Sequence, residues 1–198
     1  MLPSKSLSDN DAQVLLQNII GWLIQSLEKG EGAVVVRKLC SVLAAYFLQF
    51  SQSWTRCVKH LLYCLCIGQA IPYSELGDTP ESTILIQNLS SDKAVMIFWF
   101  ISTLVEDVGK MDSSSMKQYG SCLLNRRVPQ YQLTKFARHK FHQQVIPNVE
   151  DVVPLIQKYL TGDVVSTDVK VRQESLRCFQ VSLSILISNN TLYEGCLL

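Results

Sequence analysis

The chain has 198 residues, of which 47% are hydrophobic and 18% are charged, and 18 basic against 17 acidic side chains give a net charge of +1. This composition excludes a disordered polar chain and provides a core for one ordinary domain. The balanced charge does not favour nucleic acid as a partner. Nine glycines and six prolines are few for an all-β sandwich and suit long helices.

Seven cysteines and two apolar stretches bear on the compartment. An odd cysteine count without a secretory signal indicates free thiols in a reducing environment. Of the two stretches, 34–50 is interrupted by Arg37 and Lys38, and 94–105 is too short for the roughly 20 residues that cross a bilayer. We therefore expect a soluble intracellular protein with no membrane insertion.

Two helices are predicted in the first fifty residues. Ser8 and Asp9 are N-cap types, and the apolar residues that follow recur at helical spacing, which predicts a helix over 9–28 ended by Gly30. A second helix is predicted over 33–49. Its apolar face has a spacing of three and four residues and consists of Val36, Leu39, Cys40, Leu43, Phe47 and Phe50.

Two further helices follow in the centre of the chain. Ser53 is expected to cap a helix over 54–67, and glycines and prolines then indicate an irregular connection with one short helical turn. A helix over 92–108 is apolar nearly all round, which predicts burial between neighbours. It is expected to end at Gly109, and the carboxylates of Glu106 and Asp107 would then oppose the helix dipole. This suggests that something outside the helix uses them.

A polar stretch over 112–115 separates these elements from the last three predicted helices. They cover 130–145, 149–160 and 168–187, with Pro147 ending the first of them and Pro154 bending or delaying the second. About seven helices in up-down order, paired at spacings near forty residues, fit the HEAT and armadillo class. The expected fold is an all-α, HEAT-like α-solenoid of stacked antiparallel hairpins, in which each pair needs its neighbours to bury its faces.

Candidate chemistry is sparse. Cys57, His60 and Cys64 lie on one side of a predicted helix, and Cys66 follows, but zinc sites normally take paired ligands from two elements. Buried apolar cysteine is the preferred interpretation. No phosphate-binding, dinucleotide-binding, nucleophile-elbow or zinc-protease motif occurs. We expect no enzyme activity, no metal and no cofactor.

A basic neighbourhood begins at Arg126 and Arg127 and continues through Lys135, Arg138, His139, Lys140 and His142, with aromatic residues between. An acidic or phosphorylated partner or nucleic acid could bind there. A solvated helix face is the simpler explanation, so nucleic acid binding is not expected.

Four segments nevertheless resemble one family. They are Val36-Arg37-Lys38-Leu39-Cys40-Ser41-Val42-Leu43-Ala44-Ala45-Tyr46-Phe47 with the later Trp54; Phe100-Ile101-Ser102-Thr103-Leu104-Val105-Glu106-Asp107-Val108; Asn125-Arg126-Arg127; and Leu176-Arg177-Cys178-Phe179. In this order, over 34–180, they are similar to the exportin/importin-β-like segment of karyopherin-β nuclear transport receptors. The subgroup that they resemble is that of importin-thirteen and transportin-SR.

The resemblance implies a superhelical HEAT solenoid over 1–180 that is found in nucleus and cytoplasm. Its partners would be protein cargo, phenylalanine-glycine nucleoporins and the GTPase Ran. Receptors of this family are several times longer than this chain, so we expect a fragment whose Ran-binding repeats lie before Met1. Glu106, Asp107, Arg126 and Arg127 are the candidate partner-binding residues.

The tail over 181–198 departs from the family, because the expected tryptophan after Gln180 is absent. A Val181-Ser182 start is what read-through into an intron would encode, so 181–198 is interpreted as a divergent, non-native tail. Cutting a solenoid exposes apolar faces, which predicts that the chain alone self-associates. Two other hypotheses are a generic HEAT-repeat scaffold for an unrelated protein and a helical enzyme domain.

Overall fold

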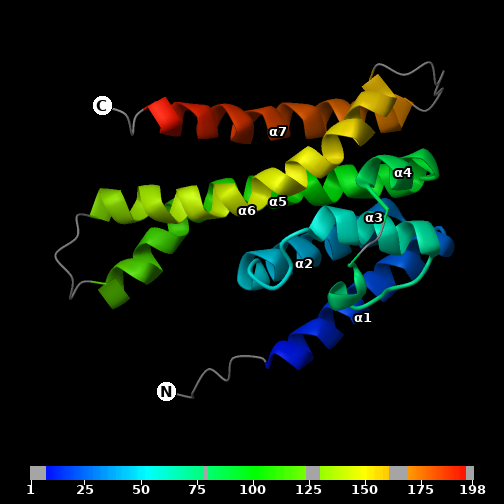
Figure 1. Cartoon of the computed structure of the whole chain (residues 1–198), viewed down its shortest axis with the longest axis horizontal. Helices are drawn as coiled ribbons and strands as arrows, with labels where there is room; N and C mark the ends of the chain where they lie inside the picture. Colours follow the sequence, from blue (N-terminus) through cyan, green and yellow to red (C-terminus); the bar gives the residue numbers. More distant parts are fainter. Residues whose placement is uncertain (1–7, 78–79, 124–129, 161–168, 195–198) are drawn as a thin grey trace.

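The protein is all-helical in the computed structural model, which describes the backbone of residues 8–77, 80–123, 130–160 and 169–194 (Figure 1). Side chains are described for 8–77, 80–108, 143–160 and 169–185. No strand occurs in the described ranges, which confirms the predicted all-α class. The elements are α1 (Asp9–Glu28), α2 (Ala33–Phe50), α3 (Cys57–Ile67), the 3-10 turn η1 (Tyr73–Glu75), α4 (Ser82–Gln87), α5 (Ser91–Leu123), α6 (Gln130–Leu160) and α7 (Val169–Glu194).

Local signals determine the bounds of α1. The Ser8 hydroxyl accepts a hydrogen bond from the Asp11 amide at 3.2 Å and donates one to the Asp11 carboxylate at 2.6 Å, so the first turn is capped. At the other end Gly30 adopts a φ of 65°, a left-handed conformation that favours glycine. The predicted bounds of this helix are confirmed, and α2 ends at Phe50, one residue later than expected.

The start of α3 was predicted wrongly. Ser53 and Trp54 lie in a turn, and the helix begins at Cys57 without a side-chain cap of its own. A residue of α6 replaces the local cap, because the Asn148 side-chain oxygen accepts the Val58 amide at 3.1 Å. Its amide nitrogen donates to the carbonyls of Thr55 at 2.8 Å and of Gln144 at 3.0 Å.

The predicted ends of α5 and α6 are also wrong. α5 continues through Gly109 and the polar stretch over 112–115 to Leu123, since a glycine within a helix costs only about 1 kcal/mol. α6 is a single helix that contains both Pro147 and Pro154, where two shorter helices were expected. It changes direction along its length (Figure 1), as internal prolines produce.

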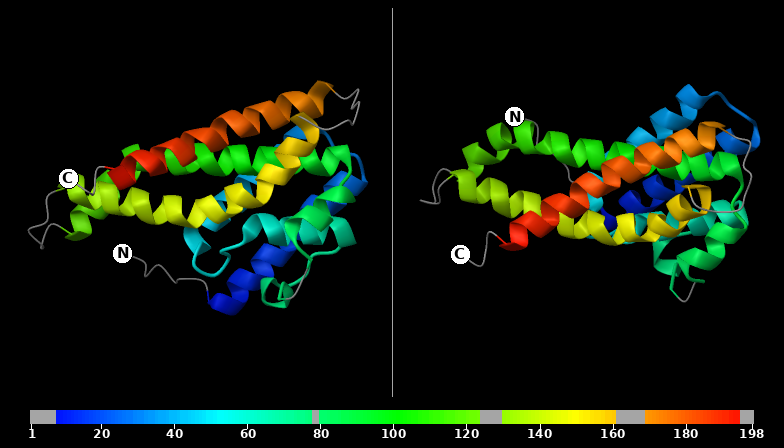
Figure 2. Two further views of the ribbon diagram at one scale, coloured as in Figure 1. Left: turned by 45° about the horizontal axis from the view of Figure 1, so that its top comes forward. Right: turned by 90° about the horizontal axis from the view of Figure 1, so that it is seen from above.

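The first and the last helix of the chain lie at the two edges of the molecule (Figure 1). α1 and α7 lie on opposite sides of the molecule, with α2, α3, α5 and α6 between them (Figures 1 and 2). α5 packs between α2 and α7, and α6 packs against α3, α5 and α7. The apolar all-round sequence of α5 is thereby explained, because Ala94 to Ile101 are all buried.

Trp54 lies at the centre of the core. It is fully buried, and its ring centroid lies 6.3 Å from that of Phe47 on α2 and 6.1 Å from that of Phe100 on α5. Its indole nitrogen donates a hydrogen bond to His60 Nδ1 on α3 at 3.0 Å. One aromatic side chain in a turn therefore joins three helices.

By length and composition alone α2 could cross a membrane, and it is the one such helix in the part of the chain that was searched. Its apolar face, including Cys40, Leu43 and Phe47, is buried within the molecule, and α2 packs against α1 and α5. The rest of α2 is more open, with Val34, Val35 and Val42 exposed. The absence of membrane insertion stays a prediction.

The last helix runs through residue 181 without a break. α7 begins at Val169 and extends past the predicted end at 187 to Glu194. Ser182 and Ile185 are buried, and Val181 packs against the core. The interpretation of 181–198 as read-through stays a prediction, which comparison with the genomic sequence would test.

Candidate partner-binding groove

A polar groove lies where α2, α5 and α7 meet. It has a volume of about 290 Å³, which is small for a ligand site. Three helices contribute to it because α5 lies between the other two. Its lining consists of Arg37, Ser41, Trp99, Ser102, Thr103, Glu106, Asp107 and Arg177.

Two ion pairs connect α7 to its neighbours at this groove. Arg177 of α7 binds the Glu106 carboxylate of α5 at 2.9 Å, and Arg37 of α2 binds the Glu174 carboxylate of α7 at 2.8 Å. Both arginine side chains are about half exposed, at 49% and 51%. Each pair joins one guanidinium nitrogen to one carboxylate oxygen, so further N–H donors remain on each guanidinium.

Trp99 forms one wall of the groove, and two cations lie over its ring. The Arg37 guanidinium carbon lies 4.5 Å from the ring centroid, and the Lys170 ammonium lies 5.4 Å from it. Cations at such distances are attracted by the negative face of the indole. The ring therefore holds a residue of α2 and a residue of α7 against α5.

The structure brings two of the four predicted site residues to this groove. Glu106 and Asp107 both line it, whereas Arg126 and Arg127 lie outside the described residues. The reason given for selecting the carboxylates is wrong, because they lie in the middle of α5 and do not meet the negative end of its dipole.

Sequence reasoning did not single out the groove residues Arg37, Trp99 and Arg177, nor Glu174, which pairs with Arg37. The pair of Arg37 and Glu174 joins positions 137 residues apart, and the pair of Arg177 and Glu106 joins positions 71 residues apart. No pattern of local spacing reports such contacts.

The thiols near these helices are buried. Burial raises the pKa of Cys178 to about 12, although hydrogen bonds with Ser182 and Ser102 oppose that shift. Burial also raises the pKa of Cys40 to about 12, with Arg37 opposing it. A protonated thiol is a poor nucleophile, so these cysteines serve packing in this form.

Of the residues considered for a zinc site, His60 makes other hydrogen bonds, and Cys57 and Cys64 are buried thiols. His60 accepts the Trp54 indole N–H on Nδ1, and its Nε2 donates to the Ile71 carbonyl at 3.0 Å. Both ring nitrogens that could bind a metal are therefore used. Burial raises the pKa of Cys57 and of Cys64 above the ordinary thiol value, and no group of three metal-binding side chains occurs in the part of the chain that was searched.

The groove is suited to recognition by charge. It combines half-exposed arginines with carboxylates and hydroxyls, so its chemistry fits polar contacts with a macromolecular surface. The side chains of the basic neighbourhood up to His142 are outside the described part. Searches of family models, curated proteins and solved structures find no match to this chain.

Proposed function

We propose that this chain is a segment of a karyopherin-β nuclear transport receptor of the importin-thirteen and transportin-SR type. In this proposal it forms HEAT-like repeats and binds protein cargo through its surface, as part of a longer receptor that moves between nucleus and cytoplasm. Nucleoporins and Ran would bind the same receptor, with Ran held mainly by repeats outside this chain.

The observation that supports the proposal most directly is that segments carrying the resemblance pack against one another. Trp54 contacts Phe47 of the first segment and Phe100 of the second. Arg177 of the last segment pairs with Glu106 of the second. Contacts that link residues as far apart in the chain as 106 and 177 thus join these segments, as expected if the similarity reflects a common packing unit.

The helix order also supports a repeat architecture. α2, α5 and α7 pack side by side as one row, and α3 packs against both α1 and α6 as a second row. Two rows of helices that advance together along the chain are what stacked hairpins produce. HEAT repeats remain part of the proposal.

Glu106 and Asp107 are the proposed partner contacts. They lie with Arg37 and Arg177 at a junction of three helices, where a partner would contact several elements at once. Charged residues at such a surface control specificity and association rate more than affinity.

The test is a pull-down with Ran locked in its GTP form and, separately, with a phenylalanine-glycine nucleoporin fragment. The full-length gene product and this chain are compared side by side. We expect both baits to capture the full-length product and Ran to capture this chain weakly or not at all. A full-length product that binds neither bait would contradict the proposal and favour the generic HEAT scaffold.

A cargo screen on the full-length product tests the groove itself. Glu106→Arg combined with Asp107→Arg is expected to weaken binding of captured cargo at least about tenfold, as loss of well-placed charge contacts does. Glu75→Arg combined with Glu81→Arg, at two exposed carboxylates outside the groove, is the charge-matched control and should leave cargo binding unchanged. Equal effects of the two variants would exclude the groove as the contact.

A further inference from the structure

The two helices at opposite edges of the molecule each keep an apolar face uncovered. α1 packs chiefly against α2, and α7 packs against α5 and α6. Their remaining faces point away from the molecule (Figure 1). Exposed apolar faces commonly mark surfaces that bind another macromolecule.

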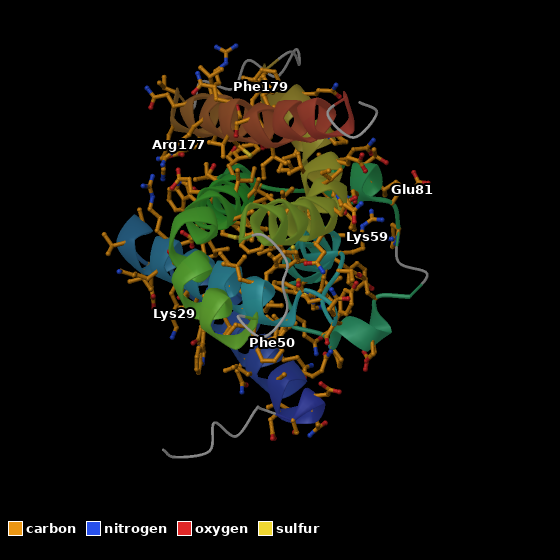
Figure 3. The ribbon with its side chains drawn as sticks, turned by 90° about the vertical axis from the view of Figure 1, so that its left-hand side faces the viewer. Lys29, Phe50, Lys59, Glu81, Arg177 and Phe179 are labelled. Atoms are coloured by element: carbon orange, nitrogen blue, oxygen red, sulfur yellow. The ribbon has the colours of Figure 1, made fainter. Side chains whose placement is uncertain are left out.

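On α7 the exposed apolar residues form one stripe. Val169, Leu176, Phe179 and Leu183 are separated by seven, three and four residues, the spacing of one helix face. Their exposed fractions range from 36% to 64%. Phe179 lies on the side of α7 that faces away from α5 and α6 (Figure 3). The adjacent face of α7, with Val171, Ser175 and Cys178, is buried.

On α1 a shorter stripe has the same spacing. Trp22 follows Leu15 by seven residues, and Val14 lies beside Leu15. Trp22 is 56% exposed, which is unusual for the largest apolar side chain. The inner face of the helix, including Leu16, Ile20 and Leu23, is fully buried.

The charges that flank the two stripes have opposite signs. Arg172 is exposed four residues before Leu176 on α7, whereas Arg177 and Lys170 contact Glu106 and Trp99 of α5. On α1, Asp11 is exposed four residues before Leu15. Asp9 and Glu28 add two more exposed carboxylates to that helix. The exposed cation of Arg172 beside the α7 stripe thus matches the exposed carboxylate of Asp11 beside the α1 stripe.

We propose that copies of this chain associate head to tail, with the α7 face of one copy on the α1 face of the next. Such a contact joins two different surfaces, so it leaves one free face at each end and can continue into longer assemblies. A symmetric dimer of two α7 faces is disfavoured, because it would bring Arg172 of both copies to the same interface. The inference does not depend on nuclear transport.

The experiment uses two variants of the whole chain and light scattering after size-exclusion chromatography. Leu176→Ser with Phe179→Ser removes the α7 face, and Leu15→Ser with Trp22→Ser removes the α1 face. Wild type is expected to grow beyond the dimer as concentration rises, whereas each variant alone stays monomeric. An equimolar mixture of the two variants should form a complex of twice the single-chain mass and stop there.

The other outcomes overturn the proposal in distinct ways. If the α1-face variant dimerises alone, the contact is symmetric through α7. A monomeric wild type, or a mixture that stays monomeric, shows that the α7 and α1 faces do not bind each other. Ile84→Ser, at an exposed position of α4, is the control and should associate as wild type does. Circular dichroism checks that all variants keep their helices.

Exchanging the charges of Arg172 and Asp11 tests the same contact independently. Arg172→Glu and Asp11→Arg should each raise the concentration for half-association at least about threefold. The double variant should recover most of that loss, and added salt should weaken wild-type association. The Ran and nucleoporin pull-downs measure binding of other proteins, so failure here leaves the proposed transport function intact.

Discussion

The contact between Trp54 and His60 defines the protonation state of a buried histidine. With Nδ1 accepting the indole N–H and Nε2 donating to Ile71, the ring is neutral and has no site for a second proton. Burial lowers the pKa of His60 to about 4, although the bond to Ile71 acts in the opposite direction. The histidine is therefore a structural residue whose loss of neutrality would disrupt the core.

Acid should destabilise the protein through His60. The unfolded chain takes up this proton near pH 6.5, whereas the folded chain resists it until about pH 4. The contribution of His60 is complete above pH 6.5, and on the order of 3 kcal/mol is lost as the pH falls to 4. Urea unfolding across this range should show the loss.

His60→Gln is the matched comparison, since glutamine can accept from Trp54 and donate to Ile71 but does not titrate. We expect it to be less stable than wild type at pH 7 and to approach wild type as the pH falls. Parallel pH profiles for the two proteins would assign the acid sensitivity to other groups.

At the scale of elements, the start of α3 depends on α6. Asn148 is fully buried, and its side chain makes three hydrogen bonds to backbone groups. Nearby, Asp151 receives two hydrogen bonds from Arg56, at 2.9 and 2.6 Å, and one from Ser82 at 3.0 Å. These contacts connect the beginnings of α3 and α4 to one stretch of α6.

Removing the Asn148 side chain, which caps α3, should destabilise the protein. Asn148→Ala leaves the Val58 amide and the Thr55 carbonyl without their partner, which should lower the free energy of unfolding by about 3 kcal/mol. Asn18→Ala, at an exposed position of α1, should change it by less than about 0.5 kcal/mol. Similar values for both would mean that water replaces the lost bonds. Thermal or urea unfolding measures the difference.

The elements that the sequence predicted well are those with local signals. Ser8 and Gly30 delimit α1 because both act within one turn of the helix. α3 was misplaced because its cap comes from Asn148, and α6 was divided because Pro147 was taken as a terminator. Glu106 was found, but its partner Arg177 could not be, since only packing brings α5 and α7 together.

For the molecule as a whole, burial of apolar side chains should contribute far more to the free energy of unfolding than the surface ion pairs do. Phe47→Ala removes a fully buried ring and should lower the free energy of unfolding by about 4 kcal/mol. Arg177→Ala removes a half-exposed ion pair and should lower it by less than about 1 kcal/mol. A larger effect of Arg177 than of Phe47 in urea unfolding would contradict this ranking.

The cap on α3 has a consequence for synthesis on the ribosome. Val58 leaves the exit tunnel 90 residues before Asn148 does, so for that interval the first turn of α3 lacks the side chain that completes it. α1, with its local cap, and α2, which packs against it, can form while translation continues. The middle of the nascent chain must wait for α6, and during that delay its apolar residues are exposed to chaperones and to neighbouring nascent chains.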